Sequence, residues 1–306
     1  MLTFLLKRVL YLVPVVLGVS VAVFLMIHLI PGDPAMIVAG MEATQEDIES
    51  VRRALGLNEP IYVQYFKFIS RALVGDFGTS FRTGRAVSAE IGARYFNTLQ
   101  LGLTAILVAV LFGGFTGILS AVRKYSVIDN ASLLASLVGV SMPTFFLGLV
   151  LMLIFSVTLG WFPLAGKGTW LHIVLPAITL GTPSAAVVSR MTRSSLVEIL
   201  DQDYIRTARA KGLGEFVVIN IHAIRNALIP VVTVIGLQLG YLLGGAVVTE
   251  TVFAWPGIGR LVVQSILARD FPVVQASVLI LAVTFVLLNL ITDLLYGVLD
   301  PRIKLQ

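Results

Sequence analysis

The sequence predicts an all-α membrane protein with about six transmembrane helices. Of its 306 residues, 57% are hydrophobic and 13% are charged, against about 25% charged in an ordinary soluble domain. The apolar residues gather in blocks close to the roughly 20 residues that cross a bilayer as a helix. The absence of cysteine excludes disulfides and thiolate metal ligands. In a membrane protein a net charge of +5 is explained by basic residues in the cytoplasmic loops. We therefore expect the chain to lie in a lipid bilayer and not to bind nucleic acid.

Six apolar blocks mark the predicted spans, with boundaries good to a few residues. They cover residues 9–30, 99–122, 133–159, 171–188, 228–248 and 273–299. The first block follows Lys7 and Arg8 as a signal peptide would. It exceeds the apolar core of a signal peptide, roughly 7–15 residues, and has no clear cleavage site, so we interpret it as a retained anchor.

Lysine and arginine set the predicted orientation. With the N-terminus inside, twelve basic residues of the short connections are cytoplasmic and three are outside. Because cytoplasmic loops carry the basic excess, both termini are predicted to be cytoplasmic. The inner residues are Lys7, Arg8, Arg123, Lys124, Arg190, Arg193, Arg206, Arg209, Lys211, Arg225, Arg302 and Lys304, and the outer ones are Lys167, Arg260 and Arg269.

Two long connections divide the chain into three predicted parts. Residues 1–30 form the cytoplasmic N-terminus and first span, residues 31–98 an extracytoplasmic cap segment, and residues 99–306 a five-helix core with a cytoplasmic loop at 189–227. Thr44 and Asp47 stand at capping-box positions for a helix over 44–55. Four aromatic residues of the cap are expected to pack on one another or on the loop at 255–257, because exposed they would form an aggregation-prone patch. They are Tyr62, Tyr65, Phe66 and Phe68.

Signatures of catalysis are missing from the sequence. His28, His172 and His222 stand apart, and no HExxH, GxSxG or paired carboxylates accompany them. The nearest approach to a phosphate-binding loop, at 160–168, has one residue too many between its glycines and no Ser or Thr after the lysine. We therefore expect no enzymatic activity and no ATP hydrolysis on this chain.

The predicted spans are almost bare of charge. Asp293, beside Asn289 and Thr292, is the main exception. A charge at bilayer depth costs at least about 2.5–3.5 kcal/mol, and snorkelling or helix pairing explains this one better than ion coupling. An ion-coupled secondary transporter or channel that works without an ATPase remains the alternative class.

Small residues and prolines shape the spans. Gly236, Gly240 and Gly244 form a stripe that lets another backbone approach, within the subunit, at a subunit interface or along a pathway wall. Gly113 and Gly117 do the same in the second span. Kinks or broken helices are expected at three prolines, Pro143, Pro176 and Pro183.

The most informative segment lies in the loop 189–227. It reads Asp203-Tyr204-Ile205-Arg206-Thr207-Ala208-Arg209-Ala210-Lys211-Gly212-Leu213 and continues through Arg225-Asn226-Ala227-Leu228-Ile229-Pro230. This run resembles the EAA loop of permease subunits in bacterial ATP-binding-cassette (ABC) importers, in particular the dipeptide and oligopeptide branch with its glutathione and nickel relatives. Arg206 and Thr207 replace the Glu and Ala of the general motif, and the expected proline comes later, at Pro230. We associate these differences with the peptide branch.

The resemblance covers nearly the whole chain. Further matches are Lys7-Arg8, Pro31-Gly32-Asp33-Pro34, Gly75-Asp76-Phe77-Gly78, Glu250 through Phe253-Ala254-Trp255-Pro256-Gly257-Ile258-Gly259, and Asp300-Pro301-Arg302. It implies a type I ABC importer permease fold in a bacterial inner membrane. It also implies that the residues from Asp203 to Leu213 form a coupling helix that sits in a cleft on an ATPase. The Trp255-Pro256-Gly257 turn, on the outer side, suits an external gate or a docking point for a binding protein.

The resemblance also implies partners and a transport cycle. The partners are a second homologous permease, two ABC ATPase subunits that bind ATP and Mg, and an extracytoplasmic substrate-binding protein; this chain itself holds no cofactor. Movement of the coupling helix would drive alternating access. The implied substrates are di- or oligopeptides, glutathione, nickel complexes or other small solutes, and the sequence does not choose among them.

Overall fold

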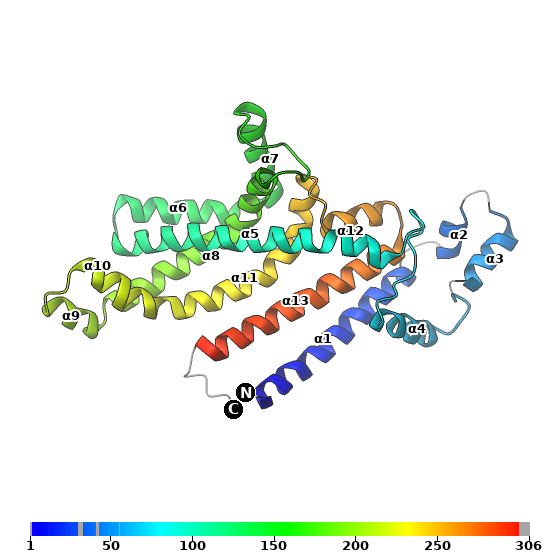
Figure 1. The fold of residues 1–306 in the computed structure, drawn as a ribbon, viewed down its shortest axis with the longest axis horizontal. Coiled ribbons are helices and arrows are strands. Elements are labelled where there is room, and N and C mark those ends of the chain that lie inside the picture. Colours follow the sequence, from blue (N-terminus) through cyan, green and yellow to red (C-terminus); the bar gives the residue numbers. More distant parts are fainter. Residues whose placement is uncertain (1, 30–32, 41–42, 55, 300–306) are drawn as a thin grey trace. The chain divides into compact units, whose positions relative to one another are not determined.

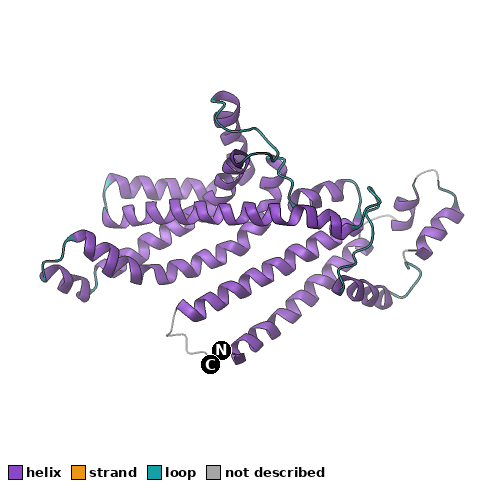
Figure 2. Cartoon of the chain, viewed as in Figure 1, coloured by secondary structure: helices purple, strands orange, loops and turns teal. Residues whose placement is uncertain are grey.

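The computed structural model describes residues 2–29, 33–40, 43–54 and 56–299, and its regular secondary structure is helical (Figures 1 and 2). Within these ranges the only β-pairing is an isolated bridge between Thr79 and Ala86. The segments 31–32 and 300–302, which carry part of the family resemblance, lie outside the described residues. So do the side chains of Lys7, Arg8 and Asp293.

The helices follow one another along the whole described chain. The α-helices are α1 (Leu2–Leu29), α2 (Pro34–Ala39), α3 (Gln45–Ala54), α4 (Ile61–Leu73), α5 (Val87–Val122), α6 (Val127–Ser141), α7 (Thr144–Leu151), α8 (Val174–Leu200), α9 (Asp203–Ala210), α10 (Glu215–Val217), α11 (Ile224–Val252), α12 (Ile258–Leu267) and α13 (Phe271–Leu299). Two π-helical segments, η1 (Met152–Thr158) and η3 (Val218–Ala223), and one 3₁₀ turn, η2 (Trp170–Ile173), join them.

The six predicted spans correspond to α1, α5, the α6–α7 pair, α8, α11 and α13. Four helices of the described residues are long and apolar enough to cross a bilayer, or five if the bent α6–α7 pair is one span. The described apolar part of α1, Leu12–Met26, is shorter. The all-α membrane fold is therefore confirmed, while the number of spans and the side on which the termini lie stay predictions.

The third predicted span is not a continuous helix. It breaks between Ser141 and Thr144, and the two halves are bent by 109°. Pro143 stands in the break with extended backbone (ψ 133°), as expected for a residue that cannot continue the hydrogen-bond ladder of a helix. The predicted break at Pro143 is confirmed, whereas Pro176 and Pro183 both lie within α8.

The chain folds as two compact units, and each is described by itself. One comprises residues 98–255 with segments at both ends of the chain, and the other comprises residues 6–97 and 256–286. In the first unit α8 packs on α6, α7 and α11.

Two buried clusters occupy opposite ends of the same three helices in the first unit. One contains Leu101 of α5, Leu180 of α8 and Trp255 after α11. The other contains Ala121 of α5, Leu196 of α8 and five further residues, Ile205, Ala208, Val218, Ala223 and Ala227. Residues 101 and 121 are twenty positions apart along α5, which at 1.5 Å per residue is about 30 Å, the thickness of a hydrocarbon core. The clusters therefore stand at the two ends of a membrane-spanning bundle.

Glycines bring α5 and α8 unusually close. A Cβ at Gly113 would lie 2.4 Å from the carbonyl oxygen of Ala185, and one at Gly117 would lie 2.6 Å from that of Ser189. From the other side, a Cβ at Gly181 would lie 2.6 Å from the carbonyl oxygen of Ala105. Gly113 and Gly117 thus serve packing within this chain.

The second unit joins the predicted cap to α12 and α13. Val87 and Ile91 pack with Ile258, Leu261 and other buried residues of α12 and α13, so α5 begins well before the span predicted at 99–122. The buried carboxylate of Asp270 accepts hydrogen bonds from the Ser80 hydroxyl and from the backbone N–H of Phe81. A buried acid at the α12–α13 turn therefore fixes the loop at residues 80–81, before α5.

The cap shows the expected helix start and an unexpected aromatic contact. The backbone N–H of Thr44 donates to Asp47 Oδ2 (2.9 Å), and that of Asp47 donates to Thr44 Oγ1 (3.2 Å), so the capping box forms. Tyr65 and Phe68 pack on Phe24 of α1, with ring centroids 5.5 and 6.0 Å away.

Not all of the cap aromatics are covered. Tyr65 also contacts Phe66, but Tyr62 and Phe66 are 66% and 68% exposed. The predicted packing on one another therefore holds in part, and the larger contact is with α1.

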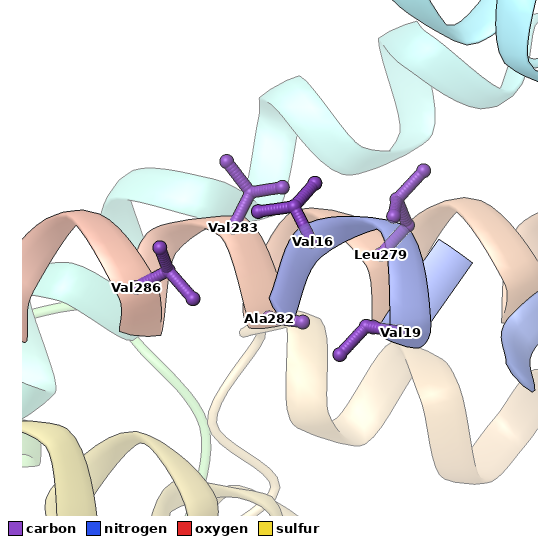
Figure 3. Close-up of a pocket in the computed structure, with 6 residues that line it drawn as sticks. All are labelled: Val16, Val19, Leu279, Ala282, Val283 and Val286. Atoms are coloured by element: carbon purple, nitrogen blue, oxygen red, sulfur yellow. The ribbon is translucent and has the colours of Figure 1, made fainter. Parts of the chain in front are cut away.

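A shallow hollow between α1 and α13 is lined by aliphatic side chains (Figure 3). They are Val16, Val19, Leu279, Ala282, Val283 and Val286. No polar atom is available there to orient a polar solute, so this hollow is not a candidate solute site.

Candidate coupling site

The predicted coupling helix forms as α9 and ends at Gly212. The backbone N–H of Gly212 donates to the Arg209 carbonyl (2.9 Å), and that of Leu213 donates to the Ala208 carbonyl (3.4 Å). This pair of bonds is the Schellman motif, which requires a left-handed residue after the helix. Gly212 has φ +78°, a conformation that costs glycine little and a β-branched residue much.

Helix α9 has one buried face and one free face. Ile205 and Ala208 are buried in the cluster with Ala121 of α5 and Leu196 of α8. The other residues of the predicted site are exposed, namely Asp203, Tyr204, Arg206, Thr207, Arg209, Ala210, Lys211, Gly212 and Leu213. Ala208 is 8% exposed and faces its own subunit, so of the two small residues Ala208 and Ala210 only Ala210 is open to a partner.

The charges of the free face are paired along the chain. Arg206 Nη1 lies 3.3 Å from Asp203 Oδ1, and Arg209 Nε lies 2.7 Å from Glu215 Oε1. All four side chains are largely exposed, so these pairs add little stability. They instead present an alternating charged surface that a partner can meet.

A polar contact links α9 to the start of α11. Asn226 Nδ2 donates to the Tyr204 hydroxyl oxygen (3.0 Å) and to the His222 carbonyl (3.2 Å). His222 lies in the π-helical segment η3, which continues directly into α11. The coupling helix is thus joined to α11 by a hydrogen bond and by the irregular helix itself.

Sequence reasoning missed the ion pair beneath this site. The sequence places Arg193 among the inner basic residues of the loops. In the structure its guanidinium forms an ion pair with Asp129, which is 1% exposed. Asp129 follows Ser126, which caps α6. A carboxylate in the first turn of an apolar helix was the available signal, and a single sequence does not reveal its partner.

The turn from Glu250 to Gly257, predicted to face outside, is packed and largely buried. Trp255 is 1% exposed and lies against Leu101, Ala105, Leu242 and Ala246. Lys167 Nζ stands 5.7 Å from the centre of its ring. An incoming protein cannot touch this tryptophan side chain, so docking on Trp255 itself is not supported.

Hydrogen bonds fix the residues on either side of Trp255 in this turn. The Thr98 hydroxyl donates to Glu250 Oε1 (2.6 Å), and Glu250 is fully buried. The Gly166 N–H donates to the Phe253 carbonyl (2.8 Å). In the second unit, Asn97 Nδ2 donates to the Pro256 carbonyl (2.7 Å), and Gly257 is buried.

The glycine stripe of α11 is divided between two environments. Gly236 and Gly240 are buried, and the Gly236 carbonyl accepts a 3.5 Å hydrogen bond from Thr292. Gly244 is exposed, and a Cβ there would meet nothing within 4 Å.

In the part of the chain that the structure describes, no three His, Cys, Asp or Glu side chains gather as metal ligands would.

A bundle of membrane-length helices with the short helix α9 packed at one end fits a membrane transport permease. The chain belongs to the family of binding-protein-dependent transport system inner membrane components. The description of that family matches residues 113–305, and that of its N-terminal region matches residues 1–102. The chain is therefore an ABC importer permease subunit and a multi-pass inner-membrane protein, in a family that works with ATPases and substrate-binding proteins. The alternative of a self-sufficient ion-coupled carrier is set aside.

Relatives and solved structures agree with this assignment. The glutathione transport system permease protein GsiC of Salmonella paratyphi A is 50% identical over 304 residues, which is 99% of each chain. The protein of the same name from Escherichia coli K12 is 48% identical over the same share.

The solved structures are more distant and show the fold alone. An inward-facing form of the MetNI methionine ABC transporter has a TM-score of 0.58 and 20% identity, covering 69% of this chain and 96% of that one. An amino acid ABC transporter with histidines has a TM-score of 0.53 and 17% identity, covering 71% and 95%.

Proposed function

We propose that this chain forms half of a translocation pathway for di- or oligopeptides or related small solutes such as glutathione. The observation that carries this proposal is the 50% identity, over essentially the full length of both chains, to a glutathione transport system permease. Such similarity extends through the spans that would line a pathway, beyond the loop shared by all permeases of the family.

The proposed assembly contains a second homologous permease and two ATPase subunits, which bind ATP and Mg and hydrolyse ATP. An extracytoplasmic binding protein delivers the solute. The free face of α9, from Asp203 to Leu213, is the proposed contact with an ATPase. Its support is its shape, since the Schellman end at Gly212 makes it a short, rigid knob anchored by Ile205 and Ala208.

At the opposite end, the turn from Glu250 to Gly257 is the proposed outer gate. Trp255 acts there as a buried wedge, and docking of a binding protein falls to exposed residues of the cap. The stripe Gly236, Gly240 and Gly244 is proposed to pack inside the bundle at its first two positions and to face the pathway or the second permease at Gly244.

Uptake by a reconstituted transporter tests the substrate class. This chain, its partner permease, the ATPases and the binding protein are placed in liposomes, and uptake of labelled glutathione, a dipeptide and a nickel complex is measured with and without ATP inside. We expect ATP-dependent uptake of glutathione or peptide. Uptake of the nickel complex alone would overturn the proposed substrate, and uptake without ATPases would overturn the assembly.

A further inference from the structure

The ion pair between α6 and α8 is built as a fixed joint. Asp129 accepts from Arg193 Nε (2.6 Å) and Nη2 (2.7 Å), one to each carboxylate oxygen. The Ser120 hydroxyl of α5 (2.5 Å) and the backbone N–H of Tyr125 (2.8 Å) complete the carboxylate's shell. Donors from α5, α8 and the α5–α6 turn thus converge on one residue of α6.

The backbone around this joint is equally constrained. Tyr125 has φ +64°, a conformation that a non-glycine residue adopts at a cost. Just beyond the joint, α5 approaches α8 so closely at Gly117 that a Cβ would overlap Thr192, the residue before Arg193. The helices are therefore held at one separation and one rotation.

The Asp129–Arg193 ion pair adjoins the residues on which α9 packs. Ser120 precedes Ala121, and Arg193 lies one helical turn before Leu196. Ala121 and Leu196 are the residues of α5 and α8 that pack with Ile205 and Ala208 of α9. A displacement of α9 is thus applied within one turn of the pair.

Stability alone does not explain an ionic joint here. Desolvation of two charges often cancels their attraction, so an apolar pair of similar volume would hold the helices as well. A bidentate fork adds direction, because two coplanar hydrogen bonds resist sliding and rotation that apolar packing tolerates.

We propose that Asp129 and Arg193 are positioning residues for transport, which make α5, α6 and α8 move as one body when α9 is displaced. This rests on the proposed contact between α9 and an ATPase. Without the fork, ATPase closure shifts α9 and α8, but the shift is not passed intact to α6 and the broken helix after it.

The test measures solute imported per ATP hydrolysed in the complete reconstituted transporter. Arg193→Lys keeps the charge and loses the fork. We expect assembly and ATP hydrolysis within about twofold of wild type, and import per ATP lowered about fivefold or more, the usual size of a coupling between sites. Arg94→Lys is the matched control, because Arg94 pairs with Glu90 within a single helix; it should leave the ratio unchanged.

A second variant separates positioning from stability. The double change Asp129→Leu with Arg193→Met removes both charges and keeps the volume, so the complex should assemble without regaining the import ratio. A wild-type ratio in either variant overturns the proposal. Failure of both variants to assemble also overturns it, since the pair would then be needed for folding alone.

Spin labels give a readout that loss of stability does not mimic. The chain has no cysteine, so Asn130→Cys on α6 and Gln202→Cys at the start of α9, both exposed and both outside the proposed ATPase contact, are specific label sites. The inter-label distance should keep one narrow distribution when ATP binds and should broaden with Arg193→Lys; a narrow distribution in the variant contradicts the proposal. Gly212→Val tests the ATPase contact separately. If Gly212→Val keeps the wild-type import per ATP, the proposed contact of α9 with an ATPase is wrong. If Gly212→Val loses import while the Arg193 and Asp129 variants keep the wild-type ratio, the contact is right and the positioning role of the ion pair is wrong.

Discussion

The two ends of the first unit are built in opposite ways. At the turn from Glu250 to Gly257, the side chains of Trp255 and Glu250 are buried and are not accessible to another protein. At the other end, Ile205 and Ala208 anchor α9, whose remaining side chains are exposed and include three charged ones, Asp203, Arg206 and Arg209. The two ends therefore differ in what another protein can reach: buried side chains at one and an exposed helix face at the other.

The largest expected loss of stability comes from removing the tryptophan side chain of this turn. Trp255→Ala should destabilise the chain by about 3–5 kcal/mol, because a large buried aromatic is lost and a cavity remains. Thermal unfolding in detergent measures it. Arg206→Ala, on an arginine that is 70% exposed, is the contrasting variant and should change stability by less than about 0.5 kcal/mol. Equal losses would remove the proposed contrast between the ends.

The close approach of α5 to α8 supports both ends and should tolerate no side chain. Gly113→Ala places a methyl group 2.4 Å from the Ala185 carbonyl oxygen, and overpacking of this kind costs about 1–3 kcal/mol. Gly114→Ala is the matched control, since a Cβ there meets nothing within 4 Å. If both variants show the same melting temperature, the helices are not as close as described.

The smallest effect is expected in the cap segment of the second unit. Thr44→Ala removes the hydroxyl that caps α3, and the amides of α3 should exchange about fivefold faster, as for loss of a typical N-cap.

The pH dependence of this effect has a defined sign. Hydrogen bonds from Thr44 lower the pKa of Asp47, so their stabilising contribution is present above the ordinary Asp pKa and is lost as the pH falls through the lowered one. The difference between Thr44→Ala and wild type should shrink in acid, and a difference that grows in acid would contradict the capping role.

Sequence reasoning predicted what depends on neighbours along the chain. The capping box at Thr44 and the break at Pro143 are local patterns, and both were found. Of the apolar blocks, four form helices long enough to cross a bilayer, or five with the bent pair. It did not predict partners distant in sequence, such as Arg193 for Asp129 or Ser80 for Asp270, because a single sequence does not show which residue a lone carboxylate will meet. It also did not separate the buried Ala208 from the exposed Ala210, since both faces of this short helix carry small residues.

The most direct test of the account compares two substitutions at Gly212 in the reconstituted transporter. Gly212→Val cannot easily adopt φ +78° and should disrupt the end of α9, whereas Gly212→Asn tolerates that conformation; a Cβ there meets nothing within 4 Å, so bulk is not the cause. With membrane insertion equal, we predict that Gly212→Val continues to hydrolyse ATP while import falls about tenfold, within the usual range of coupling between sites, and that Gly212→Asn imports normally. Full import by Gly212→Val would contradict the claim that α9 carries the force of ATP hydrolysis into the membrane helices.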